Sequence, residues 1–153
     1  MKVKVLLLLG LSLIFIVIVG YYRSDFDGVQ LPIASGSETR EVNGLKITLN
    51  DARIDSVEGE NQIVIVDVTL ANVKNTVHEF STYKMTLVDQ EGYAYDHVSY
   101  VKTKGLLGGQ LHPDRSNRGE IAFSVPKGTE YELVYTDHLR TGQVTWNVSV
   151  KGE

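Results

Sequence analysis

The stretch of residues 63–72 constrains the fold most strongly, because apolar side chains alternate along it and many of them are β-branched. One face carries Val64, Val66, Val68 and Leu70. Asp67 and Thr69 mark the other face as exposed to solvent, although Ile63 and Ile65 begin it. A period of two is typical of a strand that buries one face, and β-branched residues suit such a pleated surface. These residues therefore predict the strongest strand of the chain.

The same period recurs along the chain between turns that contain glycine, proline or acidic residues. Further strands are expected around residues 42–57, 83–88, 93–95, 121–125, 131–135 and 144–150. About eight or nine short strands with frequent turns are typical of a sandwich or barrel, and alternation with one exposed face favours two packed antiparallel sheets. We expect an all-β domain over residues 41–153, an antiparallel β-sandwich. Trp146 should lie in its core, because its ring offers the largest area to bury.

An apolar run without charged side chains precedes this domain at residues 5–22. A transmembrane helix needs about 20 mainly apolar residues, with a lower limit near 17. Lys2 and Lys4 before the run favour a cytoplasmic N-terminus, and the two tyrosines that end it suit the membrane interface. The sequence predicts one N-terminal transmembrane helix: residues 1–23 form an uncleaved signal anchor, and residues 5–22 contact the lipid bilayer.

Two alternatives remain for this run. A cleaved signal peptide would leave a secreted protein, although Ile18 stands where a cleavage site usually has a small residue. A buried core helix is the other alternative. The chain has no cysteine, which excludes lipid attachment through one. Residues 24–40 lack a period and are rich in Gly and Ser, so we expect a flexible tether spanning roughly 20–25 Å. An edge strand at residues 29–33 is the alternative there.

Charge and cysteine content exclude several classes of function. The residues from Ser24 onward carry twelve basic and nineteen acidic side chains, a net charge of −7. Contacts to phosphate need a basic surface, so we expect no nucleic-acid partner. The lack of cysteine also removes zinc–thiolate sites, blue-copper sites and thiol catalysis. An exported domain of this composition must be held together by packing, without disulfides.

The order of several motifs resembles a known family. They are IVIVDVTLAN at residues 63–72, MTLVDQEGYAY at 85–95, LHPD at 111–114, RGEIAFSVPKG at 118–128 and YELVY at 131–135. In order and spacing they resemble the telokin-like, immunoglobulin-fold family of exported proteins called domain of unknown function 4352, over residues 44–150. The resemblance implies an immunoglobulin-like β-sandwich outside the cell, and it implies no activity. One departure is Pro113-Asp114, where the family usually has Pro-Gly.

Signals for catalysis and for metal binding are weak. The four histidines, His78, His97, His112 and His138, lack the close spacing that places ligands on one strand face or one helical turn. Four acidic residues cluster in sequence: Asp51, Asp55, Glu58 and Glu60. Calcium needs several oxygen ligands on an irregular loop, so weak calcium binding is one hypothesis and a solvated acidic turn is the favoured one. We expect no enzyme, no catalytic residue, no metal site and no cofactor.

The candidate site is the stretch of residues 100–111, where an acidic domain carries basic, aromatic and apolar side chains. They are Tyr100, Lys102, Lys104, Leu106 and Leu107, among several glycines. Recognition residues concentrate on loops held by a rigid scaffold, so these five are candidates for contact with a partner. In the alternative, both leucines lie under the sandwich edge and the lysines are solvated.

Together these features predict a membrane-tethered, extracytoplasmic immunoglobulin-like domain that acts in protein interaction or adhesion and is not an enzyme. Its partner would be an extracytoplasmic protein or a component of the cell envelope. Its expected location is the cell membrane, with a single span, a cytoplasmic N-terminus and the domain outside. The alternative function is a small-ligand or ion-binding accessory domain of a cell-envelope or transport system.

Overall fold

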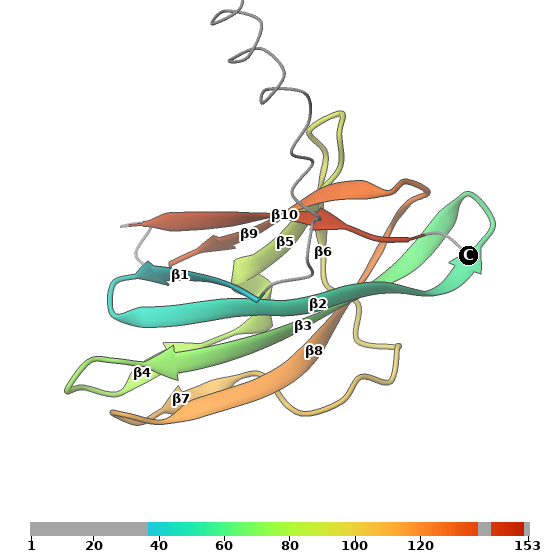
Figure 1. Ribbon diagram of the computed structural model, residues 1–153. Helices are drawn as coiled ribbons and strands as arrows, with labels where there is room; N and C mark the ends of the chain where they lie inside the picture. Colours follow the sequence, from blue (N-terminus) through green and yellow to red (C-terminus); the bar gives the residue numbers. More distant parts are fainter. Residues whose placement is uncertain (1–36, 138–141, 152–153) are drawn as a thin grey trace, which may run out of the picture. The chain divides into compact units, whose positions relative to one another are not determined.

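Two antiparallel sheets of four strands each make up most of the computed structural model, which describes residues 37–137 and 142–151 (Figure 1). The first sheet has the order β1-β2-β3-β8, and its strands are Glu38–Val42, Leu45–Glu58, Asn61–Asn72 and Ser116–Pro126. The second has the order β10-β9-β5-β6, with strands Gln143–Ser149, Glu130–Thr136, Met85–Val88 and Ala94–Asp96. A two-stranded ribbon pairs β4 (His78–Phe80) with β7 (Gly109–Leu111). The predicted all-β antiparallel sandwich is confirmed.

The long β2–β3 hairpin is the centre of the first sheet. Its register runs from Leu45 opposite Asn72 to Glu58 opposite Asn61, with two irregularities along β2. The apolar face predicted for β3 is confirmed: Val64, Val66, Val68 and Leu70 are all at most 2% exposed. Side chains of equal parity project to the same face of a strand, so this alternation alone directs them into the space between the sheets.

The opposite face of β3 differs from the prediction at its beginning. Ile63 and Ile65, expected to begin a solvent-facing side, are buried in a second small cluster with Ala122 of β8. Val98 and Val101, from the segment after β6, pack over this cluster. The segment is held by the backbone N–H of Val98, which donates to the carbonyl of Ala122 at 2.8 Å. A covered patch on the outer face was not predicted, because the covering residues follow Ile65 by more than thirty positions in the chain.

Trp146 lies in the main core between the sheets, as predicted, and is 1% exposed. Its indole Nε1–H donates to the carbonyl of Glu38 at 3.0 Å. A buried indole N–H needs an acceptor, and here the acceptor comes from the first strand of the opposite sheet. Tyr135 and Phe123 are the next largest fully buried side chains.

Two local predictions are refined by the backbone. Tyr83, expected on a strand, belongs instead to the 3-10 turn Thr82–Lys84 and is 77% exposed. Asp114, which stands where the family that the motifs resemble usually has glycine, adopts a φ of +57°. Aspartate tolerates this left-handed conformation better than most residues do, so the turn keeps its backbone shape without glycine.

The predicted anchor, residues 1–23, lies outside the described residues, as do most of the predicted tether and the alternative strand at 29–33. Strand β1 begins at Glu38, so the last three residues of the predicted tether belong to the first sheet. Within residues 37–137 and 142–151, no helix is long and apolar enough to cross a membrane.

Candidate functional site

The structure separates the five residues predicted to contact a partner. Tyr100 is 66% exposed and Leu106 is 83% exposed, and Lys102 and Lys104 are also exposed. Leu107 is 7% exposed and belongs to the main core. We call residues 100–107 the 100–107 loop. Four of its candidate side chains are thus available to a partner, whereas Leu107 holds the loop to the sandwich, as the alternative interpretation proposed for both leucines.

The 100–107 loop is held to β8 by hydrogen bonds through its backbone. The N–H of Lys104 donates to Oε2 of Glu120 at 2.9 Å, and the N–H of Glu120 donates to the carbonyl of Lys104 at 2.9 Å. The other carboxylate oxygen of Glu120 accepts from the guanidinium of Arg53 at 2.9 Å. The hydrogen bond from Arg53 lowers the pKa of the Glu120 carboxyl, so the group stays ionised as the acceptor.

Two glycines allow the loop to approach β8 closely. A Cβ at Gly119 would lie 2.8 Å from Cγ of Leu107, and one at Gly105 would lie 2.7 Å from the carbonyl oxygen of Arg118. Gly105 also has a φ of +76°, a conformation that residues with a side chain adopt rarely. The exposed side chains are therefore carried on a backbone that is packed and hydrogen-bonded at several points.

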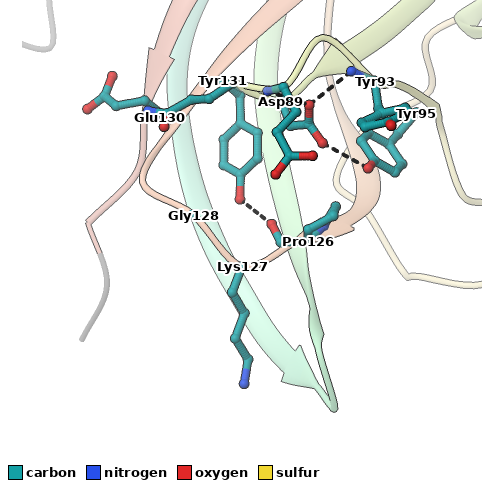
Figure 2. A pocket seen from close by; sticks show the side chains of 10 residues that line it. Asp89, Tyr93, Tyr95, Pro126, Lys127, Gly128, Glu130 and Tyr131 are labelled. Atoms are coloured by element: carbon teal, nitrogen blue, oxygen red, sulfur yellow. Dashed lines mark hydrogen bonds between the residues drawn. The ribbon is translucent and has the colours of Figure 1, made fainter.

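A second surface feature was not predicted: a hollow of about 290 Å³ between the β5–β6 turn and the β8–β9 turn. We call it the Asp89 hollow; residues 89–95 and 126–131 contribute its lining (Figure 2). Its lining residues include three acidic ones, Asp89, Glu91 and Glu130, and one basic one, Lys127. The Glu130 carboxylate points away from Asp89 in Figure 2 and accepts from the Ser149 hydroxyl at 2.7 Å. In Figure 2 the Lys127 side chain points away from Asp89. The hollow is consequently an electronegative surface.

Asp89 is oriented by its own turn. Its Oδ1 accepts from the backbone N–H groups of Glu91 at 3.0 Å and Tyr93 at 2.9 Å, and its Oδ2 accepts from the Tyr95 hydroxyl at 2.9 Å (Figure 2). Desolvation alone would raise the pKa of Asp89, but the hydrogen bonds from Tyr93, Tyr95 and Glu91 outweigh it and lower the pKa. Asp89 is therefore a fixed negative charge at neutral pH.

The opposite wall of the hollow rests on Tyr131, which is 6% exposed. Its hydroxyl donates to the carbonyl of Pro126 at 2.6 Å and accepts from the side-chain amide of Gln62 at 2.8 Å. The same amide donates to the carbonyl of Gly128 at 2.8 Å. Desolvation raises the pKa of Tyr131, and the charge of Asp89 raises it further. Gln62, a buried polar residue of β3, thus fixes the turn that forms this wall.

The Asp89 hollow was missed by sequence reasoning because its two turns are far apart in the chain. The residues DQEG at 89–92 and PKG at 126–128 are two of the turns that the sequence predicts between strands. The charged residues of both turns did indicate that each lies at the surface. Which turns meet at one edge is decided by the pairing of β5 with β9, and no local pattern states that pairing.

The acidic residues considered for calcium lie mainly on a strand. Asp51, Asp55 and Glu58 belong to β2 and Glu60 lies in the following turn. A strand separates successive residues by about 3.3 Å along its axis, so these side chains lie too far apart to bind one ion together. In the part of the chain that the structure describes, no group of three or more His, Asp or Glu residues could hold a metal ion.

The histidines are separated in space as well as in sequence. His78 is buried in β4, where its Nε2 lies 3.5 Å from the hydroxyl of Tyr135. His97 contacts the hydroxyl of Thr82 at 3.2 Å, and its ring packs edge-on against Tyr83. His112 is exposed, and His138 lies outside the described residues. The described histidines therefore do not belong to a common cluster of metal ligands.

The sequence of residues 35–145 matches the model of a protein family described as domain of unknown function DUF4352. The chain belongs to the DUF4352 family. This confirms the resemblance seen in the order of its motifs. None of the proteins with curated functions matches the sequence of the chain.

Solved structures similar to this DUF4352 domain share its fold at low sequence identity. The candidate lipoprotein ycdA of Bacillus subtilis is 19% identical with a TM-score of 0.61, and the match covers 74% of this chain and 39% of that one. The yjhA protein of Bacillus subtilis is 21% identical with a TM-score of 0.56, covering 74% and 96%. The secreted protein MPT63 of Mycobacterium tuberculosis is 12% identical with a TM-score of 0.52, covering 72% and 91%. The chain thus spans well under half of the ycdA structure.

Proposed function

We propose that this chain is a membrane-tethered, extracytoplasmic domain of immunoglobulin-like type that binds a protein or another component of the cell envelope without catalysing a reaction. One observation carries the proposal: the 100–107 loop exposes Tyr100, Lys102, Lys104 and Leu106 on a backbone fixed to β8. A partner that binds a rigid loop loses little conformational entropy in ordering it, which favours affinity.

The extracytoplasmic location is supported by several observations. The apolar run at residues 5–22 suits a membrane anchor with the domain outside. Two proteins with a similar fold are named as a candidate lipoprotein and a secreted protein. Retention of the anchor is tested by the mass of the chain recovered from membranes and from the medium. The intact mass supports the anchor, whereas loss of about the first twenty residues contradicts it and leaves a secreted protein.

The binding role is tested by site-directed photo-crosslinking of the full chain in its native membranes. A photoreactive residue replaces Leu106 in one sample and Val57, an exposed side chain of β2, in a matched control. We expect one discrete crosslinked product from position 106 and none from position 57. Combining position 106 with Tyr100→Ser and Lys102→Gln should remove the product. Equal labelling from both positions, or labelling that survives these substitutions, would contradict a role of the loop.

A second candidate function is a small-ligand accessory domain of an envelope or transport system. The Asp89 hollow favours it, since its volume of about 290 Å³ is close to the lower end of ligand pockets, roughly 300 Å³. A thermal-shift screen of the full chain with sugars, amines and short peptides tests it. A ligand that raises the melting temperature, and no longer does so in the Tyr93→Ala variant, would favour this function over the first.

A further inference from the structure

We infer that the partner of the 100–107 loop presents an acidic polypeptide segment, which binds the two lysines of the loop together with Arg118 of β8. The inference rests on the proposed function and deepens it, because it names the chemistry of the partner at that same surface. Three features carry it: two lysines without a counter-charge, guanidinium groups held on the adjacent face of the sheet, and an exposed leucine.

The two lysines of the loop are exposed cations without an acidic partner. Within residues 37–137 and 142–151, neither Lys102 nor Lys104 takes part in a salt bridge. The chain from Ser24 onward has a net charge of −7, so this pair is a local exception on an acidic domain. Their field attracts a negative group and repels a positive one.

Arg118 and Arg53 extend the basic surface onto the outer face of the first sheet. Arg118 donates from Nε and Nη2 to Asp67 at 2.7 to 3.2 Å, and Arg53 donates from Nη1 to Glu120 at 2.9 Å. The side chains of these two carboxylates are only 16% and 11% exposed, whereas their arginine partners are 64% and 44% exposed. A guanidinium group has five N–H donors, so Nη1 of Arg118 retains two for an acceptor from outside.

The loop lies beside Arg118. Glu120 binds the backbone N–H of Lys104 and is two positions from Arg118 on β8, so both side chains project from the same face of that strand. Asp67, which holds Arg118, is directly opposite Glu120 in the register of β3 and β8. The lysines and the guanidinium group are therefore fixed to neighbouring points of one surface.

Acidic residues of β2 limit this surface on one side. The hydrogen bond to Glu120 raises the pKa of Arg53, and the nearby charges of Asp55 and Asp51 raise it further. These two carboxylates offset the charge of Arg53. The basic surface is consequently centred on Arg118 and the loop lysines, on the side of β8.

The exposed apolar side chains favour a polypeptide over other anions. Leu106 is 83% exposed and Tyr100 is 66% exposed. A phosphate polymer has no apolar group to cover Leu106, whereas a protein segment with both acidic and apolar side chains complements the whole loop. An anionic lipid surface also offers both chemistries, but it would repel the rest of this acidic domain.

Binding of a defined peptide tests the inference. The full chain is placed in nanodiscs of uncharged lipid, and fluorescence anisotropy follows a labelled Gly-Glu-Leu-Glu-Leu-Gly peptide, with Gly-Gln-Leu-Gln-Leu-Gly as the neutral control. We expect saturable binding of the acidic peptide that weakens as salt is added, and no comparable binding of the control. Lys102→Gln, Lys104→Gln and Arg118→Gln should each weaken it about two- to fivefold, the range of exposed ion pairs.

Matched charge variants distinguish this surface from lysines elsewhere. Lys127→Gln and Lys151→Gln each remove one positive charge at exposed positions away from the loop. They should leave the affinity within about twofold. Equal weakening by these variants and by the three above would overturn the inference, as would unchanged binding in those three. The buried Trp146 reports by its fluorescence that each variant is folded.

Two further outcomes separate the source of the anion from the proposed function. If inorganic polyphosphate or vesicles of phosphatidylglycerol displace the peptide at the same concentration of anionic groups, the assignment to a polypeptide is overturned. A discrete crosslinked product from position 106 without binding of the acidic peptide overturns this inference alone. Binding of the acidic peptide without any crosslinked product in native membranes contradicts the proposed function instead.

Discussion

Glu120 and Lys104 are joined by two hydrogen bonds, one from each backbone N–H. The N–H of Lys104 donates to the Glu120 carboxylate at 2.9 Å, and the N–H of Glu120 donates to the Lys104 carbonyl at 2.9 Å. One residue lies on β8 and the other in the loop after β6. This pair fixes the 100–107 loop against β8, because the backbone N–H and the backbone carbonyl of Lys104 both bond to Glu120.

Removing the carboxylate should loosen the loop. Glu120→Ala removes the acceptor for the Lys104 N–H and the partner of Arg53, and an intramolecular hydrogen bond typically contributes about 0.5–1.5 kcal/mol. We expect a loss of that order in the free energy of unfolding, measured in urea. Hydrogen exchange at the Lys104 amide should become faster. Arg53→Gln is the control: it removes the ion pair alone, so protection of that amide should be retained.

The contact between Gly119 and Leu107 should be visible as energetic coupling. Gly119→Ala places a Cβ 2.8 Å from Leu107 Cγ, and such overpacking costs about 1–3 kcal/mol. In a Leu107→Ala background the clash is gone, so the same substitution should cost much less. A double-mutant cycle of unfolding free energies measures the difference. Strictly additive costs would show that the two residues are not in contact.

The two leucines of the loop should respond differently to the same change. Leu106→Ser should alter the free energy of unfolding by less than about 0.5 kcal/mol, because surface substitutions rarely do more, and Leu106 is 83% exposed. Leu107→Ser should cost at least about 2 kcal/mol, since it empties a core position and buries a hydroxyl. Partner binding should be lost with Leu106→Ser. Equal destabilisation by both variants would contradict the described loop conformation.

Acidification should remove the contribution of Asp67. Hydrogen bonds from Arg118, at 2.7 to 3.2 Å, lower the pKa of this carboxyl below its ordinary value of 3.8, against the opposing effect of desolvation. A lowered pKa means that the folded state binds the proton less tightly than the unfolded state does. The stabilisation is thus present above pH 3.8 and is lost as the pH falls from there through the lowered pKa.

Urea unfolding at a series of pH values checks this expectation. The free energy of unfolding should fall below about pH 4, and the fall should be shallower in Asp67→Asn. Arg118→Gln should remove the same part of the pH dependence, because Arg118 is the main cause of the lowered pKa. An unchanged slope in both variants would show that this pair does not contribute to acid stability.

Strand positions could be predicted from the sequence because alternation is a local property. The face of Val64, Val66, Val68 and Leu70 was recognisable from period two alone, and it is the buried face of β3. The place of Trp146 in the core followed from its size. Tyr83 was misplaced because it shares parity with Met85 and Leu87, while the 3-10 turn Thr82–Lys84 turns it away from the strand.

The candidate site was only partly predictable. Residues 100–107 could be selected by composition, since lysines, a tyrosine and two leucines stand out on an acidic domain. The exposure of Leu106 and the burial of Leu107 could not be predicted from the sequence, because side chains in a loop do not alternate with a fixed period. They depend on Gly119 and Glu120, more than ten positions later in the chain.

The sequence by itself determined the all-β class, the inward face of β3 and the family of this protein, because side-chain parity and turn chemistry act over a few residues. Only the tertiary structure decided which surfaces those strands create. The covered Ile63–Ile65 patch, the clamp of Glu120 on the 100–107 loop and the Asp89 hollow all join residues distant in the chain. Each arises from sheet order and register, which are set by packing of the whole core and not by any single segment.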